Sequence, residues 1–187
     1  MGCIERWRTA MVLGAVVMAA TALSVVPAVA AEDGGGMIGE FEGQLFDMSD
    51  GWNEATACYV GEGSVARCFR TEAEMDRWIA NQQEMFSPDG SIGTTALSCS
   101  GYLKLYDYTG YSGPVISLNQ RAKWHNLADL GFDQRTSSYK VGPCSAKFLD
   151  YANGGGAQYP SYLTQAYDQS STMISGWDND VSSVWIN

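Results

Sequence analysis

A six-residue corner occurs twice in the second half of this chain and constrains its fold more than any other feature. The first copy spans residues 133–138 and the second spans residues 178–183, so the copies lie 45 residues apart. Each begins with aspartate, ends with Ser-Ser and runs directly into a strand-like apolar segment. A second pattern repeats in step, because residues 105–113 align with residues 148–156, 43 positions later. Such a period indicates two copies of one supersecondary unit.

From residue 100 onward, short aromatic runs alternate with glycine-bearing corners, and no long helical period is present. This texture is typical of a small antiparallel β-sandwich. We place a domain at residues 99–187 and divide it into repeats 101–143 and 144–187, each long enough for one four-stranded Greek key. One key cannot bury its apolar face alone, whereas two keys packed together can. The sequence therefore predicts an all-β sandwich of two Greek-key motifs.

Residues 1–30 carry the pattern of a secretory signal peptide. Arg6 and Arg8 give a basic start, an uncharged apolar run follows from Ala10 to Val26, and small residues precede Ala30. A membrane anchor is disfavoured because a bilayer span needs about 20 apolar residues. Cys3 lies before the apolar run, which does not suit a lipoprotein. We expect a secreted, extracellular protein with no stable membrane insertion after cleavage.

The charge balance narrows the partner class. The whole chain has 11 Lys/Arg and 21 Asp/Glu, and removing Arg6, Arg8 and Glu5 with the signal peptide leaves nine and twenty, a net charge of roughly −11. Nucleic-acid binding needs clustered positive charge and is therefore disfavoured. An acidic surface attracts cations and keeps an extracellular protein in solution.

Residues 31–98 lie before the sandwich. Residues 31–57 show no convincing period and are predicted to be a flexible acidic lead, mostly coil. Within 58–98, a short disulfide-closed hairpin with a turn at 61–63 precedes a helix, and a small polar linker follows it. Thr71 and Glu74 form a capping-box pattern at the start of that helix. Its apolar face, with Trp78 at the centre, is expected to dock on the neighbouring domain.

The cysteines indicate disulfides. Of five cysteines, four remain after the signal peptide, and an even number in an exported chain argues for two bridges with three possible connectivities. We prefer Cys58–Cys68 and Cys99–Cys144, the second of which encloses the first repeat and stabilises by about 4 kcal/mol through loop closure. A zinc site is disfavoured because no CxxC pair is present.

We find no catalytic constellation. A Ser-His-Asp or Cys-His site would need His125, which is the chain's one histidine and lies in a predicted strand, where we expect a partly buried, structural role. Twenty acidic residues always offer some pair of carboxylates, but nothing singles one pair out for glycoside hydrolysis. The chain is therefore predicted to be non-enzymatic. Its tyrosines and tryptophans pack in the core or, alternatively, line a sugar-binding face.

The repeat resembles the βγ-crystallin motif, whose first hairpin carries an aromatic residue, an acid and then an aromatic–x–Gly corner. The first copy fills this pattern with Tyr106, Asp107, Tyr111 and Gly113. The second copy fills it with Leu149, Asp150 and Gly156, but has Gly154 in place of the second aromatic residue. The resemblance covers residues 101–187. It implies a βγ-crystallin-like sandwich, here preceded by the small disulfide hairpin and one α-helix.

Calcium-binding members of that family carry Asn/Asp–Asn/Asp–x–x–Ser/Thr–Ser at the corner. Residues 178–183 match in full, whereas 133–138 depart at Gln134 and bring a positive charge. The resemblance implies ligation by the hydroxyl of the fifth residue, the carbonyl of the third and an acid from the hairpin of the other copy. The candidate calcium ligands are Asp107, Asp133, Arg135, Ser137, Asp150, Asp178, Asn179, Asp180 and Ser182.

Calcium accepts six to eight hard oxygens in irregular geometry, so turns of this kind suffice. Few carboxylates imply weak binding, on the order of 0.1–1 mM. The alternative is that the corners are Asx and Ser turns whose side chains cap backbone groups. If one ion binds before the other, we expect the corner with Ser182 to fill first.

Among secreted proteins with this fold, the chain resembles the actinobacterial metallopeptidase-inhibitor type. The shared features are the signal peptide, the cysteines Cys99 and Cys144 on either side of the first repeat, and the single sandwich. Such inhibitors hold a rigid loop in a protease cleft, and preorganisation gives the affinity. The resemblance implies an extracellular protease as partner, although no inhibitory loop is carried over residue by residue. The alternative is a calcium-stabilised wall, matrix or carbohydrate-binding module whose partner is a cell-wall glycan.

Overall fold

The computed structural model describes residues 35–85 and 103–187, which belong to one compact unit running from Glu32 to Asn187. The first described segment contains β1 (Ile38–Phe41), β2 (Gln44–Asp47), η1 (Met48–Asp50), β3 (Ala57–Val60), β4 (Val65–Phe69) and α1 (Glu72–Met85). The second contains β5 (Leu103–Tyr108), β6 (Ser112–Leu118), β7 (Trp124–Asn126), η2 (Ala128–Leu130), β8 (Ser138–Val141), β9 (Ala146–Leu149), η3 (Ala152–Gly154), β10 (Gln158–Tyr159), β11 (Gln169–Ser170) and β12 (Ser183–Ile186).

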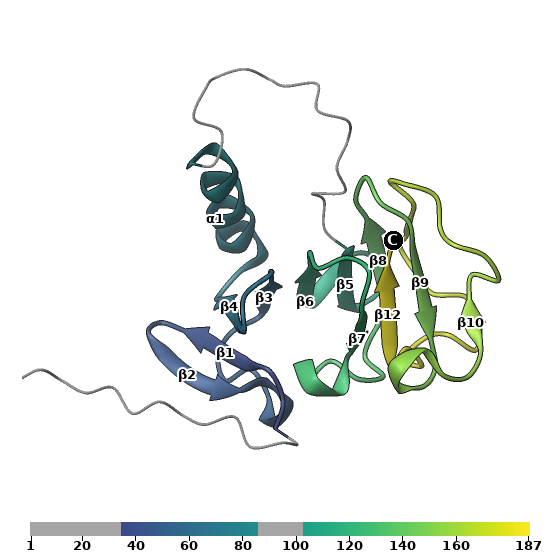
Figure 1. Cartoon of the computed structure of the whole chain (residues 1–187), viewed down its shortest axis with the longest axis horizontal. Coiled ribbons are helices and arrows are strands. Elements are labelled where there is room, and N and C mark those ends of the chain that lie inside the picture. Colours follow the sequence, from purple (N-terminus) through teal and green to yellow (C-terminus); the bar gives the residue numbers. More distant parts are fainter. Residues whose placement is uncertain (1–34, 86–102) are drawn as a thin grey trace, which may run out of the picture. The chain divides into compact units, whose positions relative to one another are not determined.

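These strands form two sheets (Figure 1). The larger has eight strands in the order β11-β8-β5-β6-β3-β4-β1-β2, and the smaller has four in the order β10-β9-β12-β7. The first repeat places β5, β6 and β8 in the larger sheet but sends β7 to the smaller one. The second repeat places β9, β10 and β12 in the smaller sheet but sends β11 to the larger one. Each repeat is thus a Greek key whose third strand pairs in the sheet formed mainly by the other repeat. This arrangement confirms the predicted βγ-crystallin-like sandwich.

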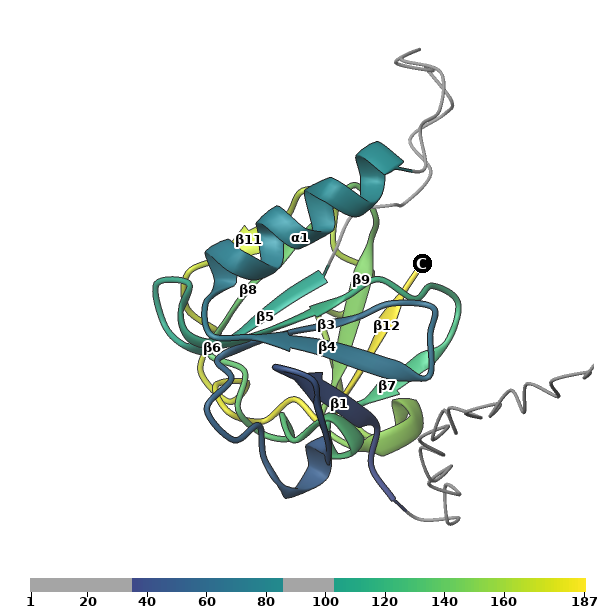
Figure 2. The ribbon, with the colours of Figure 1, turned by 90° about the vertical axis from the view of Figure 1, so that its left-hand side faces the viewer.

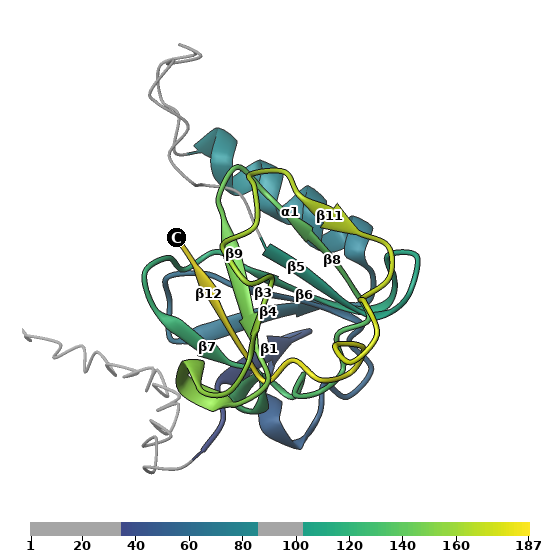
Figure 3. The same ribbon diagram turned by 90° about the vertical axis from the view of Figure 1, so that its right-hand side faces the viewer.

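The core lies between the two sheets (Figure 3). In the strands that face the core, buried side chains alternate with more exposed ones or make up most of the strand, as in β5 and β12. The side chains that meet there are almost fully buried and come from both repeats: Leu103, Leu105, Ile116, Leu118, Phe148, Val184 and Ile186. Apolar burial on this scale, at about 25 cal/mol per Å², is the main term holding the keys together.

Residues 35–69 extend the larger sheet, and the prediction of mostly coil for residues 31–57 is wrong where the structure describes them. Strand β3 pairs in parallel with β6, from Ala57 opposite Val115 to Val60 opposite Leu118. Strand β4 then pairs with β1, and β1 with β2. We call residues 35–69 the extension. Its side chains Phe41, Met48 and Trp52 join the same apolar core as the two keys.

The predicted disulfide hairpin is confirmed. Strands β3 and β4 are antiparallel, with Cys58 opposite Cys68, and these two cysteines form a disulfide. The turn between the strands contains Gly61 and Gly63, as expected. Cys144 is also disulfide-bonded, while its predicted partner Cys99 lies outside the described residues.

Helix α1 begins where the capping pattern predicts. The Glu74 amide donates to the Thr71 hydroxyl (3.2 Å), which satisfies one of the free N–H groups of the first turn. The helix lies across the outer face of the larger sheet (Figure 2). Met75 and Ile79 are buried there, and the Trp78 ring packs against Tyr59 and Phe69, so the apolar face docks as expected. Among the described residues, no helix is long and apolar enough to cross a membrane.

Candidate functional site

The two corners lie against each other and are joined reciprocally. The Gln134 amide donates to the Val181 carbonyl (3.0 Å), and the Asn179 amide donates to the Thr136 carbonyl (3.1 Å). Gln134 and Asn179 occupy equivalent positions and both have left-handed backbones, with φ of 52° and 57°. The repeat in the sequence therefore becomes a near-twofold pairing of backbones, which brings both sets of candidate ligands to one region.

The second serine of each pair closes the first hairpin of its own key. The Ser138 hydroxyl donates to the Tyr108 carbonyl (2.7 Å) and accepts from the Tyr111 amide (3.1 Å). The Ser183 hydroxyl does the same, donating to the Tyr151 carbonyl (2.6 Å) and accepting from the Gly154 amide (3.1 Å). Both serines are fully buried, so they hold the fold and are not available to a ligand.

In the corner 133–138, the candidate ligands are engaged with one another. The Arg135 guanidinium contacts both oxygens of the Asp107 carboxylate, with Nη2–Oδ2 at 2.7 Å and Nε–Oδ1 at 3.3 Å. The Ser137 hydroxyl donates to Oδ1 of Asn179 (3.2 Å). Asp133 is exposed. The Ser137 hydroxyl expected to face an ion thus already has a partner within the chain. So does Asp107, the acid that the resemblance assigned to the ion of the other corner.

In the corner 178–183, the hydroxyl and the carbonyl that the resemblance assigns to calcium are free. Among the described residues, neither the Ser182 hydroxyl nor the Asp180 carbonyl has a hydrogen-bond partner, although Ser182 is only 8% exposed. Asp178 is exposed and Asp180 half-buried. The Asp150 carboxylate, which the resemblance assigned to the ion of the other corner, accepts from the Ala157 amide (2.7 Å) and keeps further lone pairs. These are hard oxygens of the kind calcium prefers, and the residues fit a weakly bound cation here.

Neither corner is an acidic cage. Within residues 35–85 and 103–187, no group of three or more His, Cys, Asp or Glu side chains converges as metal ligands would. A cation at the corner 178–183 would therefore depend on hydroxyl and carbonyl oxygens with few carboxylates. That donor set accords with the weak affinity that the sequence predicts.

Gly154 is where the second key departs from the aromatic pattern, and a different ring fills the space. A Cβ on Gly154 would lie 2.2 Å from the Trp124 indole, and its φ is +78°. Trp124 comes from β7 of the first key and also packs on Trp185, with ring centroids 5.2 Å apart. The missing aromatic residue is thus replaced by a ring from the other key, and no local pattern in the sequence predicts this contact.

His125 is buried and structural, as expected. It is 4% exposed, and Nε2 lies 2.8 Å from the Gln120 carbonyl. Burial lowers the pKa of His125 below its ordinary value, with the hydrogen bond to Gln120 opposing that shift. A neutral ring tied to a backbone carbonyl is not placed to act as a general base for another side chain.

A second candidate site was missed by the sequence analysis: the loop 160–168 between β10 and β11. Two backbone anchors hold it, because Thr164 exchanges two 2.8 Å hydrogen bonds with Ala146 and Tyr167 donates to the Gly142 carbonyl (2.7 Å). Thr164 is buried, whereas Tyr162 is 68% exposed and Tyr167 is 63% exposed. The signal that could have indicated this loop is its length of nine residues, beginning with a proline, between two strands of two residues each.

The loop separates two hollows. One, of about 460 Å³, lies toward Arg121, Cys144 and Asn187, and the other, of about 330 Å³, lies toward Tyr139, Tyr159 and Asp168. Thr164 and Gln165 line both. The loop therefore stands as an anchored ridge that displays tyrosine side chains.

Comparison with solved structures finds similarity to βγ-crystallin domains. One from Ciona intestinalis is 20% identical with a TM-score of 0.39, and the match covers 46% of this chain and 100% of that chain. One from Flavobacterium johnsoniae is 22% identical with a TM-score of 0.37, covering 46% and 92% respectively. The N-terminal domain of protein S is 21% identical with a TM-score of 0.39, covering 46% and 96%.

Similarity at these identities concerns the fold alone. No protein-family model matches the sequence, and no curated protein matches it. The exchange of β7 and β11 between the sheets places the second half of the chain in a βγ-crystallin-like sandwich of two Greek keys.

Proposed function

We propose that this protein is a secreted, non-enzymatic inhibitor of an extracellular peptidase, which presents the loop 160–168 to the peptidase cleft. The observation that carries the proposal is the anchoring of this loop. Thr164 and Tyr167 fix its backbone to residues beside Cys144, while Tyr162 projects into solvent. A loop that is rigid before binding loses little conformational entropy in a complex, and exposed tyrosines are frequent energetic centres of interfaces. The Cys58–Cys68 disulfide supports an extracellular location.

Calcium binding at the corner 178–183 is the second part of the proposal. The free Ser182 hydroxyl and Asp180 carbonyl, with Asp178 and Asn179 beside them, would hold the ion. The ion would cross-link the turn to its neighbours and stabilise the folded chain by mass action. We assign the ion a structural role, because none of these residues belongs to the loop that we assign to the peptidase.

An inhibition panel tests the peptidase assignment. The mature protein would be assayed at micromolar concentration against metallopeptidases and serine peptidases, together with Tyr162→Ala and the matched control Tyr108→Ala. Tyr108 is 59% exposed but lies on the hairpin of the first key. We expect Tyr162→Ala to weaken inhibition about 30-fold, as for a hot-spot residue worth about 2 kcal/mol, and Tyr108→Ala to leave it unchanged. Absence of inhibition across the panel would remove the proposal.

Glycan binding is the second candidate function, and one observation favours it. The hollow of about 330 Å³ is lined by the rings of Tyr139, Tyr159 and Tyr162 and by polar groups from Gln165 and Asp168. Rings for stacking beside amide and carboxylate groups suit a neutral polyol, and no Lys or Arg is among the lining residues. Retention on chitin or peptidoglycan that is lost in Tyr162→Ala but kept in Tyr108→Ala would favour this function over inhibition.

A further inference from the structure

We infer that Arg135 is an internal cation that takes the place of calcium in the corner 133–138, and that the extension holds it there. The two corners share a backbone arrangement, but only the corner 178–183 is then open to an ion from solution. The inference rests on the calcium chemistry proposed for these corners, and it makes a separate prediction about the first of them.

The guanidinium has oxygen partners of the kind a calcium ion would take. Two of its nitrogens bind the Asp107 carboxylate, and Nη1 donates to the Gly131 carbonyl (2.8 Å). The Asp107 side chain is only 14% exposed, so its charge needs a partner close by. A forked, charge-assisted contact supplies this more firmly than a single ammonium group would.

Two aromatic rings flank the same guanidinium. Its central carbon lies 5.1 Å from the centroid of the Phe132 ring and 5.8 Å from that of Trp52, within the range of cation–π attraction. The Phe132 and Trp52 rings stack, with centroids 5.4 Å apart, and both residues are buried. The positive charge therefore lies against π-faces and a carboxylate, while the Arg135 side chain remains 36% exposed.

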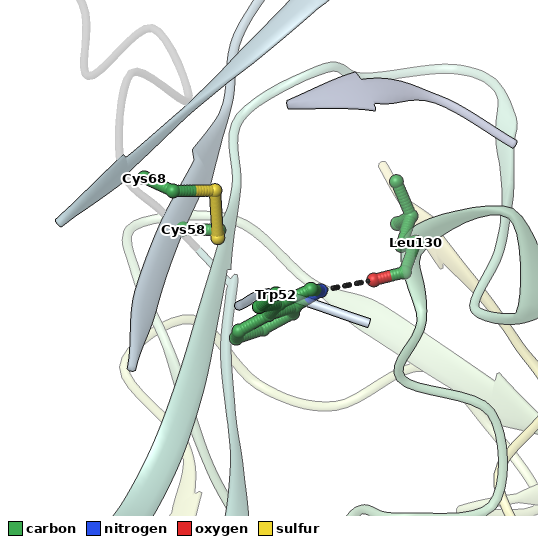
Figure 4. Close-up of a disulfide and its surroundings, with 4 residues drawn as sticks. All are labelled: Trp52, Cys58, Cys68 and Leu130. Atoms are coloured by element: carbon green, nitrogen blue, oxygen red, sulfur yellow. Dashed lines mark hydrogen bonds between the residues drawn. A yellow bond between two sulfur atoms is a disulfide. The ribbon is translucent and has the colours of Figure 1, made fainter. Parts of the chain in front are cut away.

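The extension supplies one of those rings and is fastened to the corner. The Trp52 indole nitrogen donates to the Leu130 carbonyl (2.7 Å), close to the Cys58–Cys68 disulfide (Figure 4). The Met48 carbonyl lies so near Gly131 that a Cβ there would come within 2.1 Å of it, and Gly131 has φ of +63°. These contacts fix the turn that precedes Arg135. The extension thus has a role in the site, because it packs the Trp52 ring against the internal cation.

The equivalent position in the second corner has the opposite charge. Asp180 stands where Arg135 stands in the first copy, 45 residues earlier. The serine hydroxyls of the two corners also differ. Ser137 donates to Asn179, whereas Ser182 has no hydrogen-bond partner among the described residues. One corner therefore contains its own cation, and the other presents unpaired oxygen.

Equilibrium dialysis tests the inference by measuring the number of calcium ions bound per chain in the mature wild-type protein and in Arg135→Gln. Arg121→Gln is the control, because it makes the same change of charge. Arg121 is exposed and donates to the Asn187 carbonyl, away from the corner. We expect Arg135→Gln to bind one calcium ion more than wild type, in the millimolar range or slightly tighter. Arg121→Gln should bind the same number as wild type. An equal number in wild type and Arg135→Gln would overturn the inference.

Two further outcomes separate this inference from the calcium proposal for the corner 178–183. If wild type binds no calcium but Arg135→Gln binds one ion, the internal cation stands and the proposal for the second corner fails. If Arg135→Gln does not fold, Arg135→Lys tests the inference instead. This variant keeps the positive charge but loses the two-nitrogen contact with the Asp107 carboxylate. It should bind as many ions as wild type with a lower melting temperature, and a gain of calcium in Arg135→Lys would contradict the inference.

Discussion

The two corners have nearly the same backbone and different chemistry. Gln134 and Asn179 make reciprocal hydrogen bonds, and Ser138 and Ser183 close equivalent hairpins at similar distances. Yet the third position is Arg135 in one corner and Asp180 in the other. The pairing of backbones fixes the fold of both keys, whereas the side chains at a few positions determine which corner remains open to a cation. A repeated supersecondary unit thus keeps one backbone arrangement while the two corners differ in side-chain chemistry.

Removal of Trp52 should have the largest effect, because it takes away the buried ring that packs against Phe132 and Arg135 beside the first corner. The side chain is 6% exposed, stacks on Phe132 and donates to the Leu130 carbonyl. We expect Trp52→Ala to lower the free energy of unfolding by about 3–5 kcal/mol. Trp124→Ala removes a half-buried ring that packs on Trp185 and lies beside Gly154 of the second key, and it should cost about 1–2 kcal/mol. Urea unfolding measures both, and equal losses would argue against a special role of Trp52.

The two hairpin serines offer the symmetric test. Ser138 and Ser183 are each buried and each make two hydrogen bonds to backbone groups of the hairpin. Replacement by alanine leaves a buried carbonyl and amide unpaired, so we expect each variant to lose about 2 kcal/mol of stability. Thermal and urea unfolding of Ser138→Ala and Ser183→Ala should agree closely. A loss in one variant alone would mean that the hairpins are not equivalent.

The two hairpin acids should differ. Asp107→Ala leaves the Arg135 guanidinium without its carboxylate, and we expect a loss of about 2 kcal/mol, because bonds between charged groups in a partly buried setting are the stronger kind. Asp150→Ala removes a bond to the Ala157 amide and should cost about 1 kcal/mol or less. Chemical denaturation in calcium-free buffer compares them. A larger loss for Asp150→Ala would contradict the asymmetry.

The smallest effect concerns pH and belongs to the strand that pairs with the second key. Burial lowers the pKa of His125 in the folded chain, so the unfolded chain takes up its proton first. The contribution of neutral, buried His125 to the free energy of unfolding is fully present above the pKa of the unfolded state, about 6.5. It is lost as the pH falls toward the lower pKa of the folded state. Between pH 7.5 and 5.5, wild type should therefore lose stability, and His125→Gln should lose less. Parallel pH profiles would assign the loss to other groups.

The two-key sandwich could be predicted because its determinants are local and repeated. The Ser-Ser ends of the corners make the hairpin-closing bonds, and the glycine-bearing hairpins recur at nearly the same period. The disulfide Cys58–Cys68 and the cap at Thr71 were also readable, since each depends on residues close in sequence.

The extension was missed because its order comes from distant pairing. Strand β1 has only four residues, and β2 exposes Leu45, so neither shows a clear period. The parallel pairing of β3 with β6 joins residues almost sixty positions apart and has no short-range signal. Partial information was available for the site. The positive charge of Arg135 was noted, but its fork on Asp107 and its contact with Trp52 depend on the folded arrangement.

A calcium titration of wild type, Ser182→Ala and Ser137→Ala in the mature protein tests the asymmetry most directly. The two substitutions remove the same hydroxyl from equivalent positions, one without a partner among the described residues and one bound to Asn179. We predict one calcium ion per chain for wild type and for Ser137→Ala, and none for Ser182→Ala. Calcium should raise the melting temperature of the first two alone. Binding that survives in Ser182→Ala, or that is lost in Ser137→Ala, would contradict the account.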